Sequence, residues 1–199
     1  MKIHRENPSS RRIQTVVEAL ESGHVIAYPT DSVYAIGVHP LRKKAVERLC
    51  RIRKLDPAQA NLTLICASIS QMAQFTYQID NHIYQYIREN TPGPVTFILR
   101  ASKKVSHYFK NKKKTVGIRI PDHGIAQAIV EELQYPLLSA SLKKEDDENG
   151  YYLDSESVFH DFNKMIDLVI DSGTVGDTPS MVVDCTGQEI EILREGPAG

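Results

Sequence analysis

Short apolar runs alternate in this chain with amphipathic segments of helical period, and this alternation restricts the possible folds more than any other feature. Runs such as His24–Tyr28 and Leu62–Ala67 are apolar and partly β-branched, which is typical of buried strands. Leu41–Lys54 places apolar residues three and four apart, as in a helix with one buried face. Further strands are expected at 33–37, 95–99, 115–120, 137–138, 166–170, 181–183 and 190–193, and further helices at 10–22, 70–75, 80–88, 123–133 and from about 155. Strands and helices interleaved in this way predict an α/β fold, and the short strands near the carboxyl end favour a mixed sheet.

The composition is that of an ordinary globular domain. A chain of 199 residues with 41% apolar and 25% charged residues predicts a single domain, 1–199, with a sizeable core. The net charge of −1 predicts no partner, so any nucleic-acid site must be a local patch. Cys50, Cys66 and Cys185 lie apart in apolar runs and are expected to be buried free thiols in a reducing compartment. Without a spanning apolar run or a signal-peptide core, we expect a cytoplasmic protein.

Three small polar residues, Thr30, Asp31 and Ser32, follow the strand that Pro29 ends, and a second strand follows them. Polar groups at the tip of a buried strand often bind ligands in open α/β sheets. A turn that only reverses the chain explains the same residues equally well. The ten residues Tyr28–Gly37 alone do not decide between a ligand site and a simple chain reversal.

Arginines and hydroxyl groups recur at other predicted strand ends. Arg119 ends an apolar strand just before Pro121, Thr96 follows a proline-rich turn, and Ser180 and Arg194 flank the last two strands. Such residues suit an anionic ligand that accepts hydrogen bonds, such as a nucleotide, because a guanidinium group presents paired donors. The sequence contains no Walker loop, no G-x-G-x-x-G motif and no His/Cys metal cluster, so no metal site is expected.

Six short motifs occur in an order that resembles the YrdC/YciO family, also called Sua/YciO/YrdC. They are Tyr-Pro-Thr-Asp-Ser-Val-Tyr, Thr-Pro-Gly-Pro-x-Thr, Gly-Ile-Arg-Ile-Pro, Pro-Leu-Leu-Ser-x-Ser, Pro-Ser-x-Val-Val-Asp and Arg-Glu-Gly, between about Ile13 and Gly196. The resemblance implies a twisted mixed sheet with flanking helices and a concave cleft. It also implies a threonylcarbamoyl-AMP synthase, a nucleotidyltransferase that joins ATP, L-threonine and bicarbonate and releases pyrophosphate. That product leads to the modified adenosine next to the tRNA anticodon.

The resemblance also implies roles for individual residues. Thr30, Ser32 and Tyr34 are expected around the threonine and carbamate end. The nucleotide end is expected to contain Thr115, Arg119, Ser139, Ser180 and Arg194. Mg²⁺ is expected to accompany ATP. Such a reaction depends on positioning and charge stabilisation rather than on an acid–base pair.

Two motif positions depart from the synthase pattern, which is why the chain resembles the YciO branch more closely. The synthases carry Lys-x-Arg and Ser-x-Asn, whereas this chain has Arg53-Lys54-Leu55 and Ser141-Leu142-Lys143. Arg53, Ser141 and Lys143 are therefore the candidate catalytic residues, and Leu55 removes a cation. The alternative hypothesis is a divergent or non-catalytic protein that binds RNA or a nucleotide.

A basic stretch with interleaved aromatic residues lies between Arg100 and Lys114. A solvated charged surface is the simplest explanation, but the same pattern is typical of contact with an RNA backbone. The candidate RNA-binding residues, for double-stranded RNA or tRNA, are Lys103, Lys104, Lys112, Lys113 and Lys114.

Overall fold

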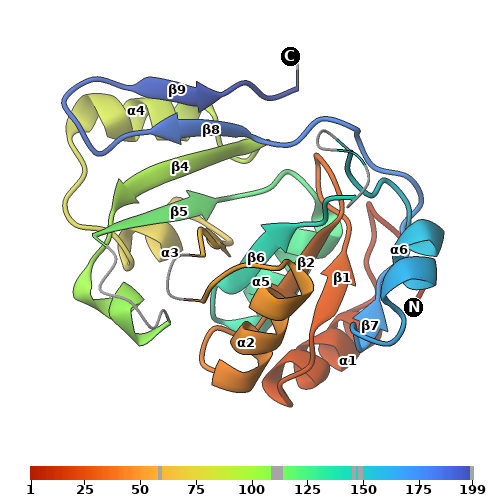
Figure 1. Cartoon of the computed structure of the whole chain (residues 1–199). Helices are drawn as coiled ribbons and strands as arrows, with labels where there is room; N and C mark the ends of the chain where they lie inside the picture. The colour runs from red at the N-terminus through yellow and green to blue at the C-terminus, as the bar shows by residue number, and fades with distance from the viewer. Residues whose placement is uncertain (58–59, 109–113, 145–146, 148–149, 198–199) are drawn as a thin grey trace.

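The computed structural model describes residues 1–57, 60–108, 114–144, 147 and 150–197, and these residues form one mixed sheet of nine strands with helices packed on it (Figure 1). The strands are β1 (Ile26–Tyr28), β2 (Ala35–Val38), β3 (Thr63–Ile65), β4 (Val95–Arg100), β5 (Thr115–Arg119), β6 (Leu137–Ser141), β7 (Leu168–Val169), β8 (Met181–Asp184) and β9 (Glu191–Arg194). Their order across the sheet is β7-β1-β2-β6-β3-β5-β4-β8-β9. The pairs β1–β7, β3–β5 and β4–β8 are parallel and the others antiparallel, so the predicted mixed α/β sheet is confirmed.

The helices form two apolar layers on opposite faces of the sheet. They are α1 (Ser10–Glu21), α2 (Lys43–Ile52), α3 (Ile69–Ala73), α4 (Asn81–Glu89), α5 (Gly124–Leu133) and α6 (Ser155–Phe162), with a 3₁₀ turn η1 at Lys103–His107. One layer contains α1 and α5 packed against Ile26, Ile65 and Leu137. The other contains α2, α3, α4 and α6 packed against the strand residues that alternate with these, such as Ala27 and Leu64. Because neighbours in a strand point to opposite faces, one sheet supplies both cores.

The start of α5 differs from the sequence-based expectation. A helix over 123–133 places its cap at Asp122, but His123 is the residue at the N-cap of α5, and its side chain makes no capping bond. The Asp122 backbone N–H instead donates to the Asp31 carboxylate over 3.0 Å, which fixes this turn to the Thr30–Ser32 turn. By contrast, Asp154 caps α6 by accepting a 2.7 Å bond from the Ser157 backbone N–H.

The structure also bears on the predictions made for the cysteines and for the charged segment 144–150. Cys50, Cys66 and Cys185 are buried free thiols, as expected. Burial raises the pKa of the Cys185 thiol to about 11, so it stays protonated near neutral pH. The charged segment 144–150 favours an exposed loop, but only residues 144, 147 and 150 of it are among those described. Within the described residues, no helix combines the length and apolar character needed to cross a membrane.

Candidate functional site

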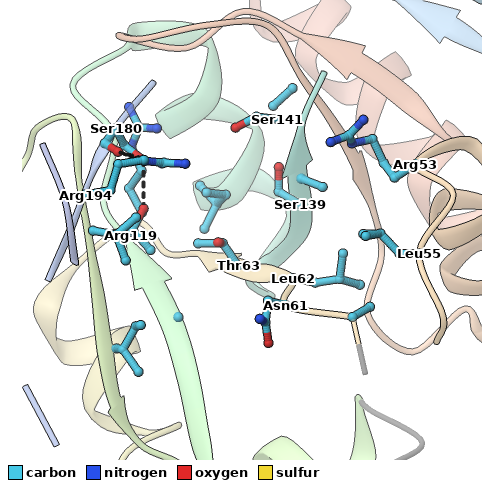
Figure 2. A pocket seen from close by; sticks show the side chains of 18 of the residues that line it. Arg53, Leu55, Asn61, Leu62, Thr63, Arg119, Ser139, Ser141, Ser180 and Arg194 are labelled. Atoms are coloured by element: carbon cyan, nitrogen blue, oxygen red, sulfur yellow. Dashed lines mark hydrogen bonds between the residues drawn. The ribbon is translucent and has the colours of Figure 1, made fainter. Parts of the chain in front are cut away.

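A cavity of about 830 Å³ lies over the middle of the sheet, on the face that α1 and α5 cover only in part (Figure 2). Those helices pack on Ile65 and Leu137, which are paired neighbours on β3 and β6. The next residues on the same face, Thr63 and Ser139, are again paired neighbours, but they line the cavity. The cavity floor is therefore the part of this face that extends beyond the two helices.

Most of the residues predicted for a site line this one cavity, although they come from distant parts of the chain. The predicted residues in its lining are Thr30, Arg53, Thr115, Arg119, Ser139, Ser141, Lys143, Ser180 and Arg194. Leu55 and Asn61 line it as well. Ser32 and Tyr34 are not among the lining residues. Figure 2 shows Arg53 and Leu55 on one side, Arg119, Ser180 and Arg194 on the other, and Ser139 and Thr63 between them.

Tyr34 anchors a loop and is not among the residues that line the cavity, so its expected place at the threonine end stays a prediction. Its side chain is fully buried, and its hydroxyl group donates to the backbone carbonyls of Ile170 and Gly173, at 3.2 and 3.4 Å. Burial raises the pKa of Tyr34 to about 12, so the hydroxyl keeps its proton and both bonds. Tyr34 therefore holds the end of β7 against β2.

The Thr30–Ser32 segment is a turn closed by its own side chains. The Thr30 hydroxyl donates to the Val33 carbonyl over 2.8 Å and accepts from the Ser32 N–H over 3.1 Å. The Ser32 hydroxyl lies 3.1 Å from that of Thr30 and is also buried. Both hydroxyl groups already have partners, so this geometry agrees with the chain-reversal interpretation, although Thr30 also borders the cavity.

Each of the three guanidinium nitrogens of Arg119 has a partner within the protein. Nη2 forms an ion pair with the Asp31 carboxylate, Nη1 donates to the Ser32 hydroxyl over 3.0 Å, and Nε donates to the Gly93 carbonyl over 3.4 Å. The side chains of Arg119 and Asp31 are only 6% and 8% exposed. The Asp31 carboxylate therefore balances the Arg119 charge, which leaves little attraction for a phosphate group.

Ser139 and Ser180 also have partners within the fold. Ser139 donates to the Ile36 carbonyl over 2.9 Å, so the Tyr28 hydroxyl, 2.7 Å away, is the donor to Ser139. Burial raises the pKa of Tyr28 to about 12, which keeps this donor protonated. The Ser180 hydroxyl forms a hydrogen bond of 3.0 Å with the Thr96 hydroxyl, and the Ser180 backbone carbonyl accepts one of 2.6 Å from Arg194 Nη2.

A second group of cavity residues is free to bind a ligand. The Arg53 Nε is buried and has no hydrogen-bond partner among the described residues, and burial lowers the pKa of this guanidinium group. The Lys143 ammonium lies 5.5 Å above the Tyr151 ring centroid. The hydroxyl groups of Thr63, Thr115 and Ser141 likewise have no partner in the described part of the chain. A half-buried arginine whose buried N–H lacks a partner among the described residues favours a ligand that supplies negative charge.

The sequence did not single out Thr63, although its position contained a usable signal. Thr63 and Ile65 are two residues apart on β3, so both project from one face. Ile65 identifies that face as the one covered by α1 and α5. A hydroxyl residue two positions before it therefore lies on the same face but beyond the helices, which only the packing reveals.

The predicted RNA-binding lysines lie outside the cavity lining. Lys103 and Lys104 are exposed on η1, and Lys114 is exposed just before β5. Lys112 and Lys113 lie outside the described residues. RNA binding therefore stays a prediction.

The fold and the cavity together define an α/β protein with a cavity rich in arginine and hydroxyl side chains. Residues 18–196 match the model of the Sua5/YciO/YrdC family, described as "Telomere recombination". The chain belongs to this family, which confirms the resemblance drawn from its six motifs.

Three relatives show how the chain compares with known proteins. It is 40% identical to an uncharacterized protein, YciO of Escherichia coli, over 98% of this chain and 93% of the relative, and the E. coli YciO crystal structure superposes with a TM-score of 0.91. It is 32% identical to a threonylcarbamoyl-AMP synthase of Vibrio campbellii over 66% of this chain and 71% of the relative. The crystal structure of P. abyssi Sua5 complexed with L-threonine is 27% identical with a TM-score of 0.87, and the match covers 98% of this chain and 57% of that one.

Proposed function

We propose that the cavity binds ATP with L-threonine and bicarbonate, and that the protein forms threonylcarbamoyl-AMP. The observation that carries this proposal is the set of unpartnered donors in one cavity: Arg53, Lys143, Ser141, Thr63 and Thr115. Similarity to threonylcarbamoyl-AMP synthases and to a Sua5 complexed with L-threonine supports the choice of substrates. The cavity volume of about 830 Å³ lies within the usual range for small-molecule sites.

The reaction suits a site without an acid–base pair. Threonine and bicarbonate first condense to a carbamate with loss of water, and a carbamate oxygen then attacks the α-phosphorus of ATP. The bond to the β-phosphate oxygen breaks, and pyrophosphate leaves with its electron pair. Catalysis then consists of alignment and of cations that stabilise the charge on the α-phosphate and on the leaving pyrophosphate. Arg53 and Lys143 are the proposed cations, and Ser141 is the proposed hydroxyl donor.

Mg²⁺ enters this proposal as part of the ATP substrate. Among the described residues, no group of three or more His, Cys, Asp or Glu side chains could hold a metal ion. Mg²⁺ usually keeps several water ligands and binds the phosphate oxygens of its nucleotide. The cavity therefore needs to bind the magnesium–ATP complex rather than the metal alone.

The proposal places Arg119 in a supporting role rather than on a phosphate. Its bonds to Asp31, Ser32 and Gly93 join the Thr30–Ser32 turn to the end of β5. Arg119 thus fixes the shape of one cavity wall. Arg53 lies on the opposite side of the cavity (Figure 2), and both Arg53 and Lys143 are close to Tyr151, so we expect the polyphosphate there.

The direct test is pyrophosphate release from ATP, measured with and without L-threonine and bicarbonate. We expect release to require both co-substrates. Binding of ATP without any release would instead favour the alternative of a nucleotide-binding protein that lacks synthase activity. No binding of ATP, AMP or threonine in calorimetry would contradict the proposal.

Replacing Arg53 by glutamine should lower kcat/KM for pyrophosphate release by about a hundredfold, because it removes a cation from the polyphosphate end. Arg51→Gln is the matched control, since Arg51 is an exposed arginine of the same helix that does not line the cavity. It should keep the parent rate. Equal rates for both variants would show that Arg53 does not bind the phosphates of ATP in the reaction.

The double replacement Leu55→Arg with Lys143→Asn restores the Lys-x-Arg and Ser-x-Asn pattern of the synthases in kind, with the new arginine taking over the role of the Lys143 ammonium. It should raise pyrophosphate release roughly tenfold, since each 1.4 kcal/mol of transition-state stabilisation gives about a factor of ten. Both positions line the cavity, so the new arginine has a cavity-facing site. The two single variants serve as controls. A folded double variant without any gain would show that the YciO branch differs from the synthases for other reasons.

A further inference from the structure

Gly117 is one of the residues on the cavity floor. It lies in the middle of β5, paired with Thr63 on one side and with Ile98 on the other. All three residues line the cavity. Thr63 is in turn paired with Ser139, so one row of the sheet crosses the whole floor at this level.

Neither backbone conformation nor packing requires a glycine here. The φ angle is not positive, unlike those of Gly23 and Gly173. A Cβ at position 117 would lie 3.5 Å from Thr63 Oγ1 and from Thr96 Cγ2, which is ordinary van der Waals contact. At Gly37 the corresponding Cβ would lie 2.7 Å from Leu137 Cδ2, so packing explains that strand glycine.

A glycine inside a strand destabilises the fold, because it adds entropy to the unfolded chain and leaves no side chain to pack. A strand glycine often marks a place where a ligand approaches the backbone closely. Since the protein itself leaves room for a side chain at Gly117, the open space is available to a ligand.

The residues at the two ends of the cavity indicate which kind of ligand would lie over Gly117. Arg53 lies at one end and Arg194 at the other, with Ser139 and Thr63 between them, as Figure 2 shows. We propose that Gly117 is a specificity-determining position that leaves room for the middle of one elongated ligand reaching both ends. The ligand class is an acyl-adenylate, whose phosphate ester joins an amino-acid-derived group to adenosine. This inference rests on the proposed function, because it takes the cavity to be the adenylate site.

The test uses Gly117→Val and calorimetric binding of two probes. The first is threonyl-sulfamoyl-adenosine, a non-hydrolysable adenylate analogue that spans the cavity, and the second is tripolyphosphate, which needs only the cationic end. We expect the variant to bind the analogue roughly tenfold or more weakly, because the valine methyl groups occupy the middle of the floor. Tripolyphosphate affinity and the urea midpoint of unfolding should not fall.

Two further variants serve as a control and as a milder substitution. Gly187→Val is the matched control, because a Cβ there would be 3.7 Å from the Glu189 carbonyl oxygen and the residue does not line the cavity. It should bind both probes as the parent does. Gly117→Ala adds a single methyl group and replaces the valine variant if that one does not fold. It should weaken analogue binding by a smaller factor.

Analogue affinity unchanged in a folded Gly117 variant would overturn the inference while leaving the proposed function intact. An equal loss of tripolyphosphate would also overturn it, because the substitution would then close the whole cavity rather than its middle. Failure of the parent protein to bind the analogue would overturn the proposed function, and the inference with it.

Discussion

Replacing Asp31 by alanine should lower the free energy of unfolding by about 3–5 kcal/mol, because it leaves the Arg119 guanidinium buried without its counter-charge. The two side chains are 8% and 6% exposed, so water cannot replace the lost carboxylate. The same change removes the acceptor of the Asp122 backbone N–H at the start of α5. Equilibrium urea unfolding measures the effect.

The double variant Asp31→Ala with Arg119→Met distinguishes the ion pair from general damage to this turn. Replacing both charges should cost much less than the sum of the two single changes, because no unpaired charge stays buried. Glu6→Ala is the control, since Glu6 pairs with Arg5 on the surface and is 80% exposed. Its effect should stay within about 0.5 kcal/mol. A cost below about 1 kcal/mol for Asp31→Ala would show that the Arg119 charge is already solvated and free for a phosphate.

Lowering the pH should destabilise the fold through His123. This ring is 2% exposed, and neither of its nitrogens has a partner among the described residues. Burial, and then the nearby cations Arg5 and Arg119, lower the pKa of His123 to about 4, although Asp31 acts in the opposite direction. Protonating the ring in the folded protein would place a third positive charge beside two others.

The direction of the effect follows from the two pKa values. The unfolded chain binds a proton on this histidine below its ordinary pKa of 6.5, whereas the folded protein does not until about pH 4. The contribution of the neutral His123 ring to the free energy of unfolding is therefore fully present above pH 6.5 and is lost as the pH falls toward 4. The full loss is about 3 kcal/mol, from about 1.4 kcal/mol for each pKa unit.

Urea unfolding of the parent and of His123→Leu at pH 7 and at pH 4.5 tests this prediction. The leucine variant should lose much of the pH dependence, because its side chain cannot titrate. His4→Gln is the control, since His4 is exposed on the surface, and it should keep the parent's pH dependence. Parallel pH curves for the parent and His123→Leu would contradict a neutral buried ring. His39 also has a pKa lowered by burial, so some pH dependence should persist in every variant.

The sequence by itself determined the class of fold and the approximate place of each element. Local periodicity explains this success, because a period of two or of 3.6 is visible in a short window and fixes which residues share a face. The order of six motifs determined the family. Most of the site residues that the resemblance implied, among them Thr30 and Arg194, are found in the lining of the cavity.

Only the tertiary structure decided which of those polar groups are free to bind a ligand. Arg119 and Asp31 are 88 residues apart, and nothing in either strand end indicates that they pair. The sequence equally gives no sign that Tyr34 turns to carbonyl groups at 170 and 173, or that α1 and α5 stop short of Thr63. Hydrogen-bond partners and uncovered surface depend on contacts between distant segments. A local pattern can therefore place a side chain on a face, but it cannot tell what that side chain meets there.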